Sequence, residues 1–169
     1  MTSTVVSAIV ALPLMILARS GEQTARVDVY TAEQLTAFSS ITGKQPASPL
    51  ADAKGIVQRY PNHYTMLITR HEDGQSELHE HIADVFFVVD GQAQLWTGGS
   101  MENGNGTEPG EQRGSGLAGA TSVSLQRGDV VHIPANVPHQ LRLAHGGTFI
   151  YFVVKVSEGD ASPQTHASH

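Results

Sequence analysis

Short apolar runs separated by turn residues occupy most of the chain after Gly55. They are rich in β-branched and aromatic residues, which is typical of strands, and Gly, Pro or Asp residues bound most of them. The dipeptide Asp90-Gly91 favours a hairpin turn between two of them. The predicted strands are residues 64–69, 76–81, 85–89, 92–97, 122–125, 130–134, 140–143 and 148–156. Many short strands with such turns predict an all-β sandwich or barrel.

A short helix is expected before the strands. Thr31 can cap it, and Glu33 and Gln34 follow in its first turn, while Gly43 can end it. Within the β region, residues 98–120 are rich in glycine and poor in apolar side chains. We expect this segment to be a mobile surface loop at a rim of the barrel, placed to act as a lid.

The N-terminus carries an apolar run over residues 5–18. It is shorter than the roughly 20 residues of a membrane span but fits the apolar region of a secretory signal. The predicted organisation is a signal peptide over 1–20, a helix and arm over 21–54, a barrel over 55–157 and a disordered polar tail over 158–169. We therefore expect export to the periplasm or outside the cell, with a buried helix in a cytoplasmic protein as the alternative.

Composition excludes several functions. The chain has 169 residues, a net charge of -6 and no cysteine. Disulfides, thiolate zinc sites and thiol nucleophiles are therefore excluded. Dispersed acidic charge lacks the basic stripe that nucleic acid requires and is repelled by anionic lipid, so neither a nucleic acid nor a membrane is an expected partner of the mature form.

Two histidines stand two positions apart in His79-Glu80-His81. On a strand, residues at i and i+2 point to the same face, so both imidazoles could reach one metal ion. Glu77 belongs to that face as well, where it could serve as a general base or lie at the rim as a solvated carboxylate.

These histidines belong to a longer pattern that runs from Gly74 through His79, His81 and Asp84 to Gly91. A second block follows, running from Gly128 through Pro134 and Asn136 to His139. The two blocks resemble the two motifs of the cupin superfamily, in which Asp84 stands for a glutamate and Asn136 for a turn glycine. Asn tolerates the positive φ that such a turn requires.

The resemblance implies a double-stranded β-helix, which is a small jelly-roll barrel. It also implies that His79, His81, Asp84 and His139 bind one divalent ion, with Asp84 either as a ligand or as a support behind the ligands. Imidazole and carboxylate ligands suit Mn, Fe, Ni, Co, Cu or Zn. Cupins commonly form homodimers, and we expect one here.

Three functions remain open at this stage. The first is a metal-dependent enzyme acting on an oxygen-rich small molecule, and the resemblance allows a dioxygenase, decarboxylase, isomerase or lyase. The second is a non-catalytic module that binds a sugar or organic acid. The third is a structural barrel without metal, whose histidines are satisfied by hydrogen bonds.

Overall fold

The computed structural model describes residues 27–37, 55–143 and 147–158. The predicted signal peptide, most of the helix and arm over 21–54 and nearly all of the polar tail lie outside these residues. In the described part, one helix, α1 (Ala32–Ala37), precedes the strands. The strands are β1 (Ile56–Arg59), β2 (His63–Arg70), β3 (Ser76–His79), β4 (Ile82–Thr97), β5 (Ser100–Glu102), β6 (Asn105–Glu108), β7 (Glu111–Gly114), β8 (Gly116–Ala118), β9 (Thr121–Gln126), β10 (Val130–Ile133), β11 (His139–Leu143) and β12 (Phe149–Ser157). Among the described residues, no helix is long and apolar enough to cross a membrane.

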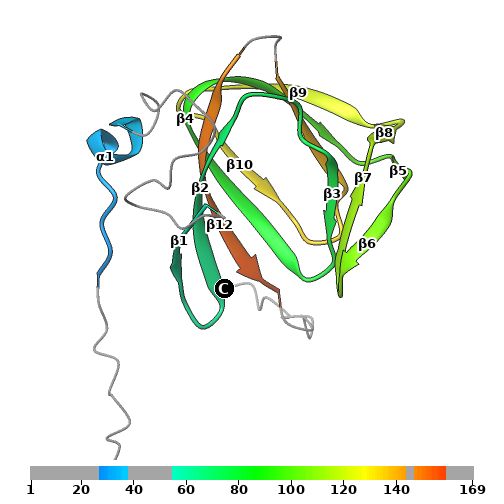
Figure 1. Ribbon diagram of the computed structural model, residues 1–169, viewed down its shortest axis with the longest axis horizontal. Helices are drawn as coiled ribbons and strands as arrows, with labels where there is room; N and C mark the ends of the chain where they lie inside the picture. The colour runs from blue at the N-terminus through cyan, green and yellow to red at the C-terminus, as the bar shows by residue number, and fades with distance from the viewer. Residues whose placement is uncertain (1–26, 38–54, 144–146, 159–169) are drawn as a thin grey trace, which may run out of the picture.

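The strands form a barrel, as Figure 1 shows. The main sheet runs in the order β1-β2-β12-β4-β11-β3-β7-β6, with β9 and β10 also paired to β4, and every pairing is antiparallel. β5 and β8 form a separate two-stranded sheet. This is the all-β double-stranded β-helix that the two motifs imply.

β4 links the two faces of the barrel. Its first part pairs with β12 and β10, and its second part pairs with β9 and β11. The predicted hairpin at Asp90-Gly91 is therefore wrong, because the strand continues through these residues. Gly91 has a φ of 84°, and a Cβ there would overlap the carbonyl oxygen of Thr148. A residue without a side chain lets the strand bend from one sheet into the other.

The apolar core occupies part of the inside of the barrel. Its buried members are Phe86, Val88, Ala93, Leu95, Leu125, Ile133, Leu141, Phe149, Tyr151 and Val153. A second cluster, Leu67, Ile150 and Phe152, is covered in part by Tyr30 and Leu35 of the N-terminal arm. Alternate residues of β12 therefore face the inside and the arm, as the period of a strand requires.

The predicted start of the helix is confirmed. The Thr31 hydroxyl accepts a hydrogen bond from the Gln34 backbone N–H at 3.2 Å, and the Gln34 side chain accepts one from the Thr31 N–H at 2.9 Å. This reciprocal pair is a capping box. The predicted end of the helix at Gly43 lies outside the described residues.

The predicted loop over residues 98–120 is a series of short strands, and its predicted mobility stays a prediction. The segment contains β5 to β8, and β7 pairs with β3 along its whole length. Glycines with positive φ at 98, 99, 110 and 119 form the turns between strands rather than a flexible linker.

Candidate metal centre

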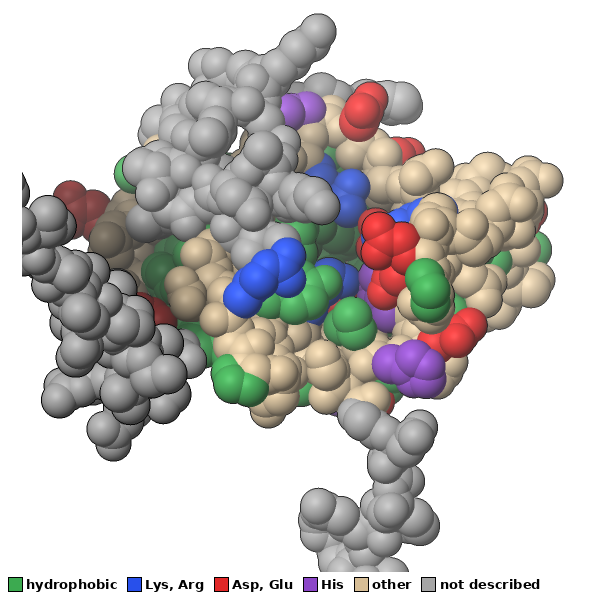
Figure 2. All heavy atoms as spheres, turned by 60° about the horizontal axis from the view of Figure 1, so that its bottom comes forward, with side chains coloured by type: hydrophobic (Ala, Val, Ile, Leu, Met, Phe, Trp, Pro, Cys, Tyr) green, Lys and Arg blue, Asp and Glu red, His purple; other side chains and the backbone are tan. Residues whose placement is uncertain are grey.

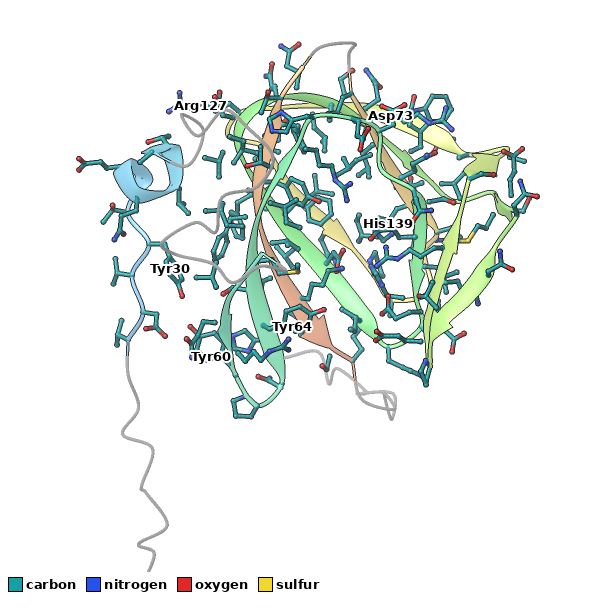
Figure 3. All side chains as sticks on the ribbon, in the orientation of Figure 1. Tyr30, Tyr60, Tyr64, Asp73, Arg127 and His139 are labelled. Carbon is teal, nitrogen blue, oxygen red and sulfur yellow. The ribbon has the colours of Figure 1, made fainter. Side chains whose placement is uncertain are left out.

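Four polar side chains converge inside the barrel. Glu77 and His79 lie on β3, Asp84 on β4 and His139 on β11. The exposed fractions of His79, Asp84 and His139 are 3%, 2% and 4%. Pairing between strands brings them together, because His139 lies directly opposite Glu77. In Figure 3, His139 lies in the interior of the barrel.

Donor atoms of Glu77, His79 and His139 all lie within 4.8 Å of one another, and Asp84 lies next to both imidazoles. His79 Nε2 lies 3.5 Å from Glu77 Oε2 and 3.7 Å from Asp84 Oδ2. His139 Nε2 lies 3.7 Å from the same Asp84 oxygen and 4.0 Å from the same Glu77 oxygen. Ligands that each lie about 2.1 Å from one ion are separated from each other by roughly 3–4 Å, so the spacing suits a divalent ion.

A contact of the Nδ1 atom orients each imidazole ring. His79 Nδ1 lies 2.5 Å from Glu111 Oε2, and His139 Nδ1 lies 3.0 Å from the carbonyl oxygen of Val137. Both acceptors require an N–H at Nδ1, which leaves a lone pair on each Nε2. Burial lowers the pKa of His139, against the opposing hydrogen bond to Val137, so the ring is neutral near pH 7. Neutral imidazole is the form that binds metal.

Glu77 is held as a carboxylate by its neighbours. Its Oε2 lies 2.5 Å from Arg113 Nη1, and its Oε1 lies 3.5 Å from Arg70 Nη2. Burial alone would raise the pKa of Glu77, but the positive charges of Arg113 and Lys155 lower it far below its usual range. A carboxylate so strongly stabilised is a weak base. The site therefore disfavours the predicted general-base role of Glu77 and suits a metal ligand or charge partner.

Lys155 provides a cation at the centre of the cluster. Its Nζ donates hydrogen bonds to both carboxylate oxygens of Asp84, each at 2.8 Å. The same Nζ lies 2.9 Å from His79 Nε2. The donor set fits a divalent ion by its chemistry and spacing, but part of that set is bound to an ammonium group.

His81, which the sequence predicts as a ligand, lies outside the cluster. β3 ends at His79 and β4 begins at Ile82, so the alternation of faces stops before His81. The turn is fixed by Asn136, whose N–H donates to the His79 carbonyl at 2.8 Å and whose side-chain amide donates to the Glu80 carbonyl at 3.0 Å. The His81 side chain is exposed. Asn136 has a φ of 64°, in keeping with its predicted role in the turn.

A cavity of about 190 Å³ opens beside the cluster. Figure 2 shows a hollow in this face of the molecule, where acidic, basic and histidine side chains gather next to hydrophobic ones. Its lining includes the apolar side chains of Met66, Ile68 and Phe86. Its charged lining residues are Arg70, Glu77, Asp84, Arg113 and Lys155.

Sequence reasoning missed Lys155, Glu111 and Arg113. Lys155 follows Tyr151 and Val153 at a spacing of two on an apolar strand, which places its charge on the inner face. That pattern could have identified it. Glu111 and Arg113 were hidden in a segment interpreted as a loop, although they lie opposite His79 and Glu77 on the paired strand.

No family model and no curated protein matches the chain. Solved structures with a similar fold include a protein from Neisseria meningitidis, 15% identical with a TM-score of 0.48, over 77% of this chain and 100% of that chain. An uncharacterized conserved protein with a double-stranded β-helix domain from Klebsiella pneumoniae is 14% identical with a TM-score of 0.48, over 80% of this chain and 95% of that one. A cupin-2 domain containing protein from Shewanella frigidimarina is 14% identical with a TM-score of 0.41, over 60% of this chain and 76% of that one.

The barrel topology is that of a double-stranded β-helix, the fold that the resemblance of the two sequence blocks to cupin motifs implies.

Proposed function

We propose that this protein binds a divalent metal ion inside its barrel and binds, or acts on, a small oxygen-rich anion next to that ion. One observation carries the proposal. Two buried imidazoles have their Nδ1 atoms tied to acceptors, so that His79 Nε2 and His139 Nε2 face the same carboxylates. The ligand set proposed here is His79, His139, Glu77 and Asp84.

The cavity supports an anionic ligand. Its wall carries three cationic side chains, Arg70, Arg113 and Lys155, against the two carboxylates of Glu77 and Asp84. A divalent ion would add further positive charge. A guanidinium presents paired donors that match a carboxylate, and the apolar lining residues suit a short hydrocarbon portion. The cavity volume limits the ligand to a small molecule.

When bound, the ion would act as a Lewis acid that polarises a ligand oxygen. The chain itself would supply orientation and charge. Arg70 and Arg113 would bind an anionic group, while Glu111 and the Val137 carbonyl hold the imidazoles in place. Tyr151 stays protonated, because burial raises its pKa to about 12. It accepts a hydrogen bond from Arg70 Nε at 3.1 Å, which fixes that guanidinium at the cavity wall.

A second candidate is a structural barrel without metal. The contacts of Lys155 with Asp84 and His79 favour it, because they already neutralise part of the cluster. Metal content decides between the two candidates. Protein expressed without added metal should contain a divalent ion at close to one per chain by elemental analysis. Absence of metal after reconstitution with Mn²⁺, Fe²⁺ and Zn²⁺ would favour the structural barrel.

The ligand class is tested with oxalate and malonate as probes. Each should raise the Tm of the metal-loaded protein, and the R70M variant should lose most of that shift. The R127M variant is the matched control, because Arg127 is an exposed residue that does not line the cavity. Equal shifts in R70M and R127M would contradict an anion site at this wall.

Export of the protein and formation of a homodimer are further proposals. We propose that residues 1–20 are removed on export, which N-terminal sequencing of protein from the native host would test.

We also propose a homodimer, supported by the cross-strand neighbours Phe87 and Val130, whose exposed fractions are 43% and 62%. Sedimentation equilibrium of the protein and of its F87D variant should show a dimer and a monomer, respectively.

A further inference from the structure

We infer that the ammonium group of Lys155 occupies the proposed metal centre as a counter-ion of its carboxylates. This group must leave the cluster before a divalent ion can be bound. The inference rests on the proposed metal-binding function and goes beyond it, because it assigns a competing state to the same cluster. Its consequence is that the metal affinity of the protein is lower than its four donor side chains would otherwise give.

The position of Lys155 is fixed by the sheet. β12 pairs with β4 on one side and with β2 on the other, so that Lys155 lies opposite Asp84 and Tyr64. The backbone therefore cannot withdraw without breaking both pairings. Only the side chain can move, and its flexible four-carbon stem allows this.

The ammonium group and a metal ion cannot share the cluster. Lys155 Nζ is within 2.9 Å of His79 Nε2 and within 2.8 Å of each Asp84 oxygen. An ion bound to His79 and Asp84 at about 2.1 Å would occupy the space that the ammonium group now fills. In addition, two cations a few ångströms apart in a buried site repel each other strongly.

The cavity gives the displaced side chain somewhere to go. Lys155 lines the cavity together with Asp84 and His139, so rotation of its stem moves the ammonium group from the cluster into that space. There it would face an anionic ligand on the same side as Arg70 and Arg113. Metal binding would therefore increase the positive charge in the ligand cavity, because it moves the Lys155 ammonium group there from the cluster.

The first test compares K155M with the unmodified protein by calorimetric titration with Zn²⁺ and Mn²⁺. Methionine keeps much of the length of the stem but removes the charge. We expect K155M to bind Zn²⁺ at least about tenfold more tightly, because the competing state is removed. Its Tm should be lower without metal and should rise more on addition of Zn²⁺. R127M removes one positive charge from the surface and should behave like the unmodified protein.

The second test does not depend on whether K155M folds. The unmodified protein is labelled with ¹⁵N-lysine, and its Nζ signals are followed by NMR during titration with Zn²⁺, using K155R to assign the signal of Lys155. We expect the Lys155 signal, protected in the metal-free protein, to shift or broaden in proportion to bound Zn²⁺. An unchanged Lys155 signal at full Zn²⁺ occupancy would overturn the inference.

The outcomes separate this inference from the proposed function. If the unmodified protein binds metal and K155M binds no more tightly, the inference is wrong and the metal centre stands. If only K155M binds metal, the inference stands and the native protein is the structural barrel. If neither binds metal, both are wrong.

Discussion

Lys155 and Asp84 face each other across β12 and β4, and the Lys155 ammonium lies 2.8 Å from both oxygens of the Asp84 carboxylate. Their exposed fractions are 8% and 2%, so water solvates neither charge well. A buried ion pair of this kind contributes little net stability compared with an apolar pair of similar volume. Removal of one partner is costly because the other charge stays buried.

The first prediction follows from this asymmetry. K155M and D84N should each lower the free energy of unfolding of the metal-free protein by about 3–5 kcal/mol. The D84N/K155M double variant should recover a large part of that loss, because no uncompensated charge remains. Urea unfolding of all four proteins gives the coupling energy. Additive losses in the double variant would show that the two side chains do not interact.

The second prediction concerns the order of importance of the ligands. H79A and H139A should abolish stoichiometric Zn²⁺ binding, because both imidazoles present Nε2 to the same carboxylates. H81A should bind Zn²⁺ normally, because His81 is exposed in the turn after β3. Titration calorimetry distinguishes these outcomes. Full metal occupancy in H139A would contradict the assigned centre.

The third prediction concerns the support of His79. E111Q should retain metal but weaken its affinity by roughly 10–100-fold, because a neutral amide holds the Nδ1 proton less strongly than a carboxylate. Glu108 provides the control, since it is exposed on β6 and pairs opposite Glu111. E108Q should leave the affinity unchanged. If E111Q and E108Q have equal affinities, Glu111 does not position the ring.

The outline of the fold could be predicted from sequence because it depends on local signals. Alternating apolar residues indicated the strands, Thr31 and Gln34 formed the expected capping box, and Asn136 adopted the expected positive φ. The path of β4 was harder to predict. Asp90-Gly91 favours a hairpin turn, but Gly91 forms a bend because β12 and β9 pair with the two halves of one strand.

The site was only partly predictable for a related reason. The motifs were enough to predict that His79 and His139 belong to the cluster. The direction of the His81 side chain depends on where β3 ends, and the turn held by Asn136 ends β3 at His79. Glu111 and Arg113 reach the cluster through the pairing of β7 with β3, which joins residues far apart in sequence. Such long-range pairings are not visible in local periodicity.

The fourth prediction concerns alkaline pH. Burial raises the pKa of Tyr151 to about 12, so the folded protein keeps this phenol neutral at a pH where the unfolded chain ionises it. A raised pKa in the folded state stabilises the protein fully below the unfolded pKa of about 10, and this stabilisation is lost as the pH rises toward 12. Y151F should therefore be less stable than the unmodified protein near pH 8, and the difference should shrink between pH 10 and 12. Urea unfolding across this range measures it, and a difference that does not vary with pH would contradict the assigned pKa.

The last prediction concerns the bend of β4. Gly91 and Gly98 both have positive φ, at 84° and 73°, so alanine at either position costs about 1–2 kcal/mol from backbone strain. The two positions differ in their surroundings. A Cβ at Gly98 meets nothing within 4 Å, whereas a Cβ at Gly91 would overlap the backbone of Thr148. G91A should therefore lower the free energy of unfolding clearly more than G98A, because β12 would have to move away from β4. Because β12 also carries Lys155 and Tyr151, G91A should disturb the Lys155 ¹⁵Nζ signal, which G98A should leave in place. Equal destabilisation by the two alanines would show that the close contact at Gly91 does not hold the two halves of the barrel together.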